Sequence, residues 1–154
     1  MKKATLCFLV RGDEVLLAMK KRGFGEGKWN GVGGKVKEGE SFLEGALRET
    51  EEEIGVSIKP ENAKEVGVLY FHWIEKPEWD QEVHVFFASE WDGEPSESEE
   101  MLPQWYKQNS IPFEVMWVDD KLWLPKVLEG KNIEASFYFG GDGSTIDRYE
   151  LKEI

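Results

Sequence analysis

The sequence predicts one α/β domain that is dominated by strands and contains one long and one short helix. Several short runs rich in β-branched and aromatic residues are separated by turn residues, which favours strands. One segment of helical periodicity begins at a capping pattern and ends at a glycine. The 154 residues suffice for one hydrophobic core, and no linker or repeat divides them. We therefore expect a single domain over residues 1–154.

In the first third of the chain, residues 5–10 and 14–19 predict two strands of a hairpin. Residues 20–34 contain six glycines, which predicts a long loop without regular structure. Loops of this length are often functional. A helix should begin at Ser41, which forms a capping-box pattern with Glu44, and end at Gly55.

The rest of the chain predicts further strands, at residues 63–73, 82–88, 101–118 (a strand and a turn), 133–139 and 145–151. Residues 89–100 form an acidic loop. Asp119 is placed to cap a short helix that reaches residue 128. Pro125 then fits only if it lies in the first turn of that helix.

Composition limits the partners of the protein. With 19 Lys and Arg against 31 Asp and Glu, the net charge is −12, which repels nucleic-acid polymers and anionic membranes. No stretch approaches the roughly 20 apolar residues that span a bilayer, and the N-terminal apolar run is too short for a signal peptide. The single cysteine, Cys7, lies in an apolar run and suits a reducing interior. We expect a cytoplasmic monomer whose partner is a small molecule.

The segment RETEEEIG, residues 48–55, concentrates acidic charge at the C-terminal end of the long helix. At 100° per residue, with Glu49 at the origin, Glu52 falls at about 300° and Glu53 at about 40°, so the three share one face. Glu51 points away, at about 200°. Such a face is either a solvated surface or an oxygen-rich site for a hard divalent cation, and the helix dipole disfavours anions here.

The surrounding stretch GGKVKEGESFLEGALRETEEEIGV resembles the Nudix box, G-x5-E-x7-R-E-U-x-E-E-x-G-U, where U is aliphatic. The residues in register are Gly34, Glu40, Arg48, Glu49, Glu52, Glu53, Gly55 and Val56. Thr50 departs from the pattern at an aliphatic position, where we expect a small packing change and no loss of chemistry. KKRGFGEGKWNGVGGKV, VHVFFA, SEEM and PFEVMWVDDKLW resemble the MutT-like branch of Nudix hydrolases that sanitises oxidised purine nucleoside triphosphates.

The resemblance implies a Nudix α/β/α sandwich with a mixed β-sheet, a long catalytic helix and a shorter C-terminal helix. It further implies Mg²⁺-dependent hydrolysis of 8-oxo-dGTP and 2-hydroxy-dATP to a monophosphate and pyrophosphate, with Mn²⁺ a possible substitute. The metal ligands implied are Glu49, Glu52, Glu53, Glu100 and the Gly33 carbonyl. Either Glu49 or Glu100 accepts the proton of the attacking water, and Arg48 orients a glutamate.

Selection of the base should depend on a separate pocket. Asn30 can donate to and accept from a purine edge, Trp117 offers a plane for stacking, and one of Asp119 and Asp120 can stay protonated and so donate. By resemblance, the substrate-binding residues are Thr5, Lys20, Phe24, Asn30, Gly33, Gly34, Phe71, Trp117, Asp119 and Asp120.

Two alternatives remain at this point. The box is also compatible with a pyrophosphatase of dinucleoside polyphosphates, nucleotide sugars or nucleoside triphosphates in general. A catalytically silent nucleotide-sensing domain would be expected to lack one or more of the glutamates of the box, and this chain has all of them.

Overall fold

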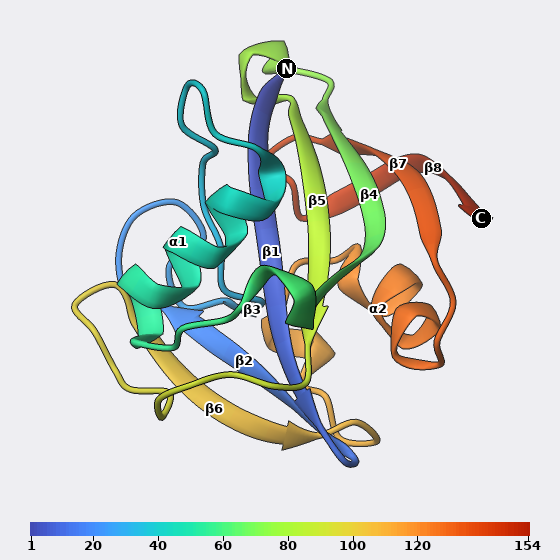
Figure 1. Ribbon diagram of the computed structural model, residues 1–154. Coiled ribbons are helices and arrows are strands. Elements are labelled where there is room, and N and C mark those ends of the chain that lie inside the picture. Colours follow the sequence, from blue (N-terminus) through green and yellow to red (C-terminus); the bar gives the residue numbers. More distant parts are fainter.

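The computed structural model describes residues 1–154 and shows a mixed β-sheet with one α-helix on each face (Figure 1). This is the α/β/α sandwich that the sequence predicts. The strands are β1 (Lys2–Arg11), β2 (Glu14–Lys20), β3 (Trp29–Asn30), β4 (Ala63–Trp73), β5 (Gln81–Ala88), β6 (Met101–Lys107), β7 (Ile133–Gly140) and β8 (Thr145–Glu153). The helices are α1 (Phe42–Ile54) and α2 (Asp120–Leu128).

The strands follow the order β3-β2-β1-β5-β4-β7-β8, and β6 pairs with the other side of β2. The pairs β1–β5 and β4–β7 are parallel, and all others are antiparallel. β1 and β2 pair over only two positions and then diverge. The segment after β3 takes the place of β2 beside β1, where Cys7 and Val32 exchange backbone hydrogen bonds of 2.6 and 2.9 Å. Gly31, Gly33 and Gly34 of this segment line the main cavity of the protein.

Helix α1 has the termini that the sequence predicts. Ser41 and Glu44 form the capping box, with Ser41 Oγ accepting from the Glu44 amide at 3.0 Å. Gly55 ends the helix with φ of 73°, a conformation that a β-carbon disfavours. Thr50 is fully buried, and its hydroxyl donates to the Ala46 carbonyl at 2.7 Å. Its polarity is therefore satisfied within the helix, which explains how it replaces an aliphatic residue.

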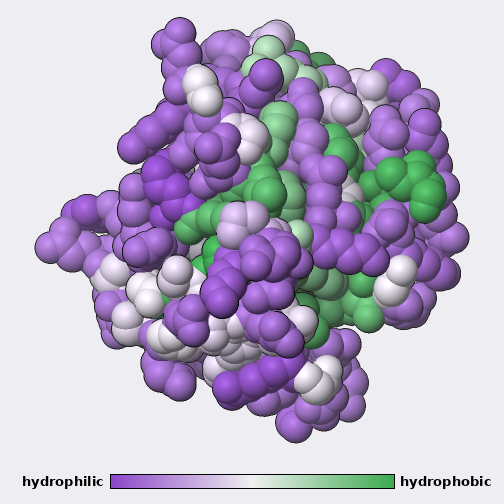
Figure 2. Space-filling view, viewed as in Figure 1, coloured by the Kyte–Doolittle hydropathy of each residue, from purple (hydrophilic) through white to green (hydrophobic).

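Alternating side chains of the sheet supply two hydrophobic cores, one on each face. On the α1 face, Cys7 and Leu9 of β1 pack with Ala46 and Ile54 of the helix. On the other face, the core contains Phe8 of β1 and residues of α2 such as Trp123. Burial raises the pKa of the Cys7 thiol to about 11, so it is a packed apolar group and not a nucleophile. Figure 2 shows hydrophilic residues over most of the α1 side, with smaller apolar patches between them.

Three details differ from the sequence-based expectations. The glycine-rich loop contains a short strand, Trp29–Asn30, which pairs with β2. Pro125 lies in the middle of α2 and not in its first turn. Asp119 stands at the N-cap position but makes no capping hydrogen bond; instead it accepts one from Trp123. No helix is long and apolar enough to cross a membrane.

Candidate active site

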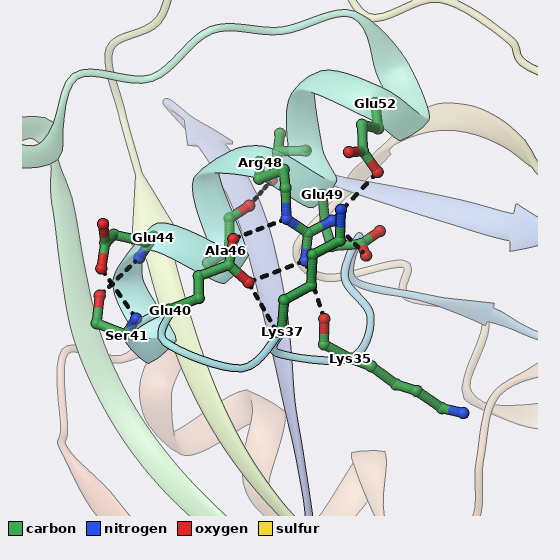
Figure 3. A network of polar contacts seen from close by, with 10 residues as sticks. Lys35, Lys37, Glu40, Ser41, Glu44, Ala46, Arg48, Glu49 and Glu52 are labelled. Atoms are coloured by element: carbon green, nitrogen blue, oxygen red, sulfur yellow. Dashed lines mark hydrogen bonds and ion pairs between the residues drawn. The ribbon is translucent and has the colours of Figure 1, made fainter.

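Arg48 lies at the centre of a polar network on α1 (Figure 3). It forms a bidentate pair with Glu40, at 2.7 and 3.0 Å, and donates to the Lys35 carbonyl at 3.0 Å. Its remaining nitrogen, Nη1, donates to Glu49 at 3.0 Å and to Glu52 at 3.2 Å. The guanidinium lowers the pKa of Glu40 to about 2, so this carboxylate stays ionised and holds the arginine in place. Arg48 thus fixes the orientation of two glutamates of the acidic face.

Glu53 occupies a different environment from its neighbours. Burial and, to a smaller extent, the negative charges of Glu49 and Glu100 together raise the pKa of its carboxyl to about 7. Its Oε2 is buried without any hydrogen-bonding partner. Glu51, by contrast, is exposed. A buried carboxylate oxygen without a partner costs free energy unless something cationic or protic contacts it, so it indicates a functional position.

Glu100 lies at the end of the acidic loop and is held by the glycine-rich loop. Arg22 Nε and Nη2 donate to its Oε1 at 2.9 and 2.6 Å. The Lys21 amide donates to the Glu100 carbonyl at 2.8 Å, and Lys21 Nζ to the Ser98 carbonyl at 2.8 Å. The Arg22 guanidinium lowers the pKa of the Glu100 carboxyl. Two segments far apart in the sequence are therefore joined next to the acidic face.

Gly33 and Gly34 both lie where an added side chain would force a neighbouring group to shift. A β-carbon on Gly33 would stand 1.8 Å from the Thr5 carbonyl oxygen, and one on Gly34 would stand 2.7 Å from the Glu49 carboxyl. The amide of Thr5 donates to the Gly34 carbonyl at 3.0 Å, whereas the Gly33 carbonyl accepts no backbone hydrogen bond. The close packing leaves that carbonyl oxygen free beside the acidic helix.

A cavity of about 440 Å³ opens beside these glycines. All ten residues expected to bind substrate line it: Thr5, Lys20, Phe24, Asn30, Gly33, Gly34, Phe71, Trp117, Asp119 and Asp120. Its volume falls within the usual range for small-molecule sites, and its lining combines apolar walls with a few polar groups. Asn30 Oδ1 accepts from the Gly31 amide at 2.8 Å, which leaves the side-chain NH₂ free to donate.

Aromatic rings form one wall of the cavity. Phe24, half exposed on the glycine-rich loop, stacks on Trp117 with ring centroids 5.3 Å apart. Trp73 and Trp79 meet Phe24 edge-on, at 5.8 and 5.5 Å. Phe24 and Trp117 were expected from the sequence, but Trp73 was not. Trp73 lies at the end of a strand, where an aromatic residue is usually part of the hydrophobic core. Planar walls of this kind suit a flat heterocycle.

Asp119 and Asp120 are both buried in the lining of the cavity. Burial raises the pKa of Asp119 to about 6, while Trp123 Nε1 donates to its Oδ2 at 2.8 Å. Burial, and then the charge of Asp119, raise the pKa of Asp120 well above its ordinary value. The raised pKa of Asp120 favours its protonated form, and its unpartnered Oδ2 can exchange a hydrogen bond with a ligand.

Unpartnered buried polar atoms gather around this region. The protein has five, on Thr5, Glu53, Trp73, Asp120 and Asn132. Three of these residues line the cavity, and Glu53 belongs to the acidic face. Because folded proteins satisfy nearly all buried polar groups, such clustering indicates that a ligand completes them.

The oxygen atoms of the expected metal ligands suit a hard divalent cation, although the carboxylates do not point toward one common position. Carboxylate oxygens and a free backbone carbonyl are the donors that Mg²⁺ and Mn²⁺ prefer. No three His, Cys, Asp or Glu side chains lie close enough to enclose an ion as they stand. Glu49 and Glu52 are turned toward Arg48, and Glu100 toward Arg22.

Other residues around the cavity were missed. Five lysines line it, namely Lys2, Lys3, Lys20, Lys28 and Lys35, and only Lys20 was expected. None of them forms an ion pair with an acidic residue, although the protein is acidic overall. Lysines scattered along the sequence carry no periodic signal. Only the fold brings these positive charges together around one cavity, where they suit a polyanion.

Both the sequence and the fold are similar to those of known proteins. The NUDIX domain family matches residues 1–127. The chain is 45% identical over 150 residues to an oxidized purine nucleoside triphosphate hydrolase of Mus musculus, covering 97% of this chain and 94% of that protein. It is 43% identical over 153 residues to the protein of the same name from Danio rerio, covering 99% and 96%. The fold is similar to that of a MutT protein from Bacillus halodurans, with TM-score 0.84, 29% identity and coverage of 99% and 98%.

Proposed function

The chain belongs to the NUDIX domain family, and from that premise we propose that it hydrolyses oxidised purine nucleoside triphosphates to the monophosphate and pyrophosphate. The relatives from mouse and zebrafish, which match nearly the whole chain, carry the name of that activity. The observation that carries the proposal is the cavity, whose lining combines Asp120, a buried carboxyl with a raised pKa, with Gly33 and Gly34, the second of which lies against Glu49 of the acidic helix. The same cavity could thus hold a base against the aspartates and a phosphate chain against the glycines.

The phosphate end requires divalent cations, which Nudix hydrolases generally use, and we propose Mg²⁺, with Mn²⁺ able to replace it. We assign the ligands to Glu49, Glu52, Glu53, Glu100 and the Gly33 carbonyl. When bound, the ions supply positive charge to the phosphate oxygens and lower the pKa of a bound water.

The other steps belong to the protein's own groups. Arg48 orients Glu49 and Glu52 through the contacts described above. Either Glu49 or Glu100 accepts the proton of the attacking water. Lys20, in the lining of the cavity, neutralises part of the phosphate charge. Gly33 and Gly34 let the phosphates approach the helix, because any side chain there would occupy that space.

The base end selects the substrate through the protonation state of the aspartate pair. We propose that neutral Asp120 donates to the base and that ionised Asp119 accepts, while Asn30 bonds a second edge. A pair that both donates and accepts can match 8-oxo-guanine and 2-hydroxy-adenine, whose polar groups are arranged differently. Trp117 and Phe24 supply faces for stacking.

We further propose that residues 1–154 form a single domain that acts as a monomer. Its proposed substrates belong to the free nucleotide pool, and we place its action in the cytoplasm.

A substrate panel tests the proposal. With Mg²⁺ present, the release of pyrophosphate from 8-oxo-dGTP and 2-hydroxy-dATP should exceed that from dGTP and dATP. A dinucleoside polyphosphate and a nucleotide sugar should be poorer still. Equal rates for the oxidised and ordinary purines would contradict the proposed substrates while leaving a Nudix hydrolase of other nucleotides. Absence of hydrolysis throughout the panel, with nucleotide binding retained, would favour the non-catalytic alternative.

A further inference from the structure

Arg22 lies outside the Nudix box. It makes the shortest hydrogen bond found to any of the proposed metal ligands, which is its contact with Glu100. Its two hydrogen bonds to Glu100, at 2.9 and 2.6 Å, both end on the same oxygen, Oε1. The arginine is carried by the turn between β2 and β3, 78 residues from Glu100 in the sequence. No motif relates the two positions, so their contact is a property of the fold.

The contact holds Glu100 away from the other carboxylates. No three acidic side chains are gathered closely enough for an ion while this pair exists. Glu100 nonetheless lies near enough for its charge to raise the pKa of Glu53. To bind an ion together with the helix carboxylates, the Glu100 side chain would have to turn away from Arg22. The loop itself stays fixed, because the Lys21 amide and side chain bond the backbone of residues 98 and 100.

Arg22 has a second carboxylate within reach. Glu99 Oε2 lies 3.6 Å from its Nη2, and Glu99 is the most exposed partner in this group, with 87% of its side chain accessible. When Glu100 turns away, Glu99 can take over the guanidinium. The exchange therefore does not leave an arginine without a counter-ion, which lowers its free-energy cost.

We propose that Arg22 is a positioning residue that holds Glu100 as its counter-ion until a divalent cation replaces it. This inference rests on the proposed function, since it requires the metal site. The pair is partly exposed, at 60% and 41% of the two side chains, and exposed pairs contribute modestly. Arg22 thus competes with the metal ion for the Glu100 carboxylate and can be displaced from it.

Binding of Mn²⁺ in the absence of nucleotide, followed by calorimetry, measures this competition without any turnover. In R22Q, Glu100 is free, and the dissociation constant for Mn²⁺ should fall about two- to fivefold. R22K keeps the charge but loses the fork that binds Oε1 twice, and should lie between R22Q and the wild type. R11Q is the matched control: Arg11 is also an exposed arginine, paired with Glu14, and its loss changes the net charge equally.

Removing Arg22 could tighten Mn²⁺ binding in two ways: by freeing Glu100, or by removing a positive charge that repels the ion. A double-mutant cycle separates these two effects. In the E100Q background, R22Q should leave the affinity for Mn²⁺ unchanged, because the competed ligand is gone. Equal tightening with and without Glu100 would assign the effect to the removed positive charge and overturn the inference. Unchanged or weaker binding in R22Q, with normal binding by the wild type, would also overturn it while sparing the metal site. A wild-type protein that binds no Mn²⁺ would overturn the proposed site and this inference together.

Discussion

Replacing Asp119 by Asn should stabilise the protein increasingly as the pH rises. The pKa of Asp119 is raised from 3.8 to about 6 in the folded protein. A carboxyl whose pKa is higher when folded binds its proton more tightly in that state. Its contribution to stability is therefore fully present below about pH 4 and is lost as the pH rises through about 6. An asparagine at this position does not titrate and escapes the loss.

The magnitude follows from the shift. About two pKa units correspond to about 3 kcal/mol of unfolding free energy over the whole titration. Roughly 1 kcal/mol of this unfolding free energy is lost between pH 5.5 and 8. The whole range lies above the pI of about 4.7, so the protein is negatively charged throughout. Asn Oδ1 can accept the Trp123 hydrogen bond in place of the carboxylate. Because the new NH₂ group costs about 1–3 kcal/mol where it finds no acceptor, the change with pH is a better measure than the absolute difference.

Urea unfolding at several pH values gives the required free energies. The stability of D119N minus that of the wild type should increase by about 1 kcal/mol from pH 5.5 to 8, which corresponds to about 2–4 °C in Tm. The control is D92N, since Asp92 is exposed and its side chain makes no hydrogen bond or ion pair. A difference that stays constant or shrinks over this range would refute the assignment of a raised pKa to the buried pair.

Three further substitutions probe the acidic helix. Glu53→Gln should reduce turnover at least about a hundredfold with an unchanged circular dichroism spectrum, whereas the control Glu51→Gln should be nearly neutral; near-normal activity of the former would refute the assigned helix face. Gly34→Ala should displace the Glu49 carboxyl, which lies 2.7 Å from the added carbon, and lower kcat about a hundredfold; unchanged kinetics would show that the carboxyl has room to move. Ser41→Ala removes the capping hydroxyl and should lower the unfolding free energy by about 1 kcal/mol, measured with urea, and no loss would contradict the capping box.

Local signals account for the parts of the fold that the sequence predicted. The boundaries of α1 follow from Ser41 and Gly55, which act within one turn of the helix, and the alternation in β7 is visible as a strictly alternating burial pattern. The strand Trp29–Asn30 was missed because two residues carry no periodicity and pair only through their contact with β2. Pro125 is tolerated in α2 because the same helix buries Trp123 and its neighbours in the core, and packing outweighs the missing amide.

The same distinction applies to the site. The spacing of Glu49, Glu52 and Glu53 on one helix face is a local property, so the sequence predicts it. The direction in which each carboxylate points depends on arginines whose own partners lie elsewhere. Glu40, eight residues from Arg48, decides where that guanidinium sits, and the conformation of the intervening turn cannot be deduced from residue types.

The concentration of glutamates at the end of α1 would be unfavourable if each carboxylate were ionised and alone, since the last turn contains no basic residue. The structure offsets the repulsion by reversible means. Arg48 shares its nitrogens among Glu40, Glu49 and Glu52, and the raised pKa of Glu53 lets a proton neutralise it. Burying a permanent counter-ion among the carboxylates would have stabilised the fold further, but it would also have filled the space that a cation and a phosphate chain need. The acidic face is therefore kept only partly neutralised, by groups that can turn away.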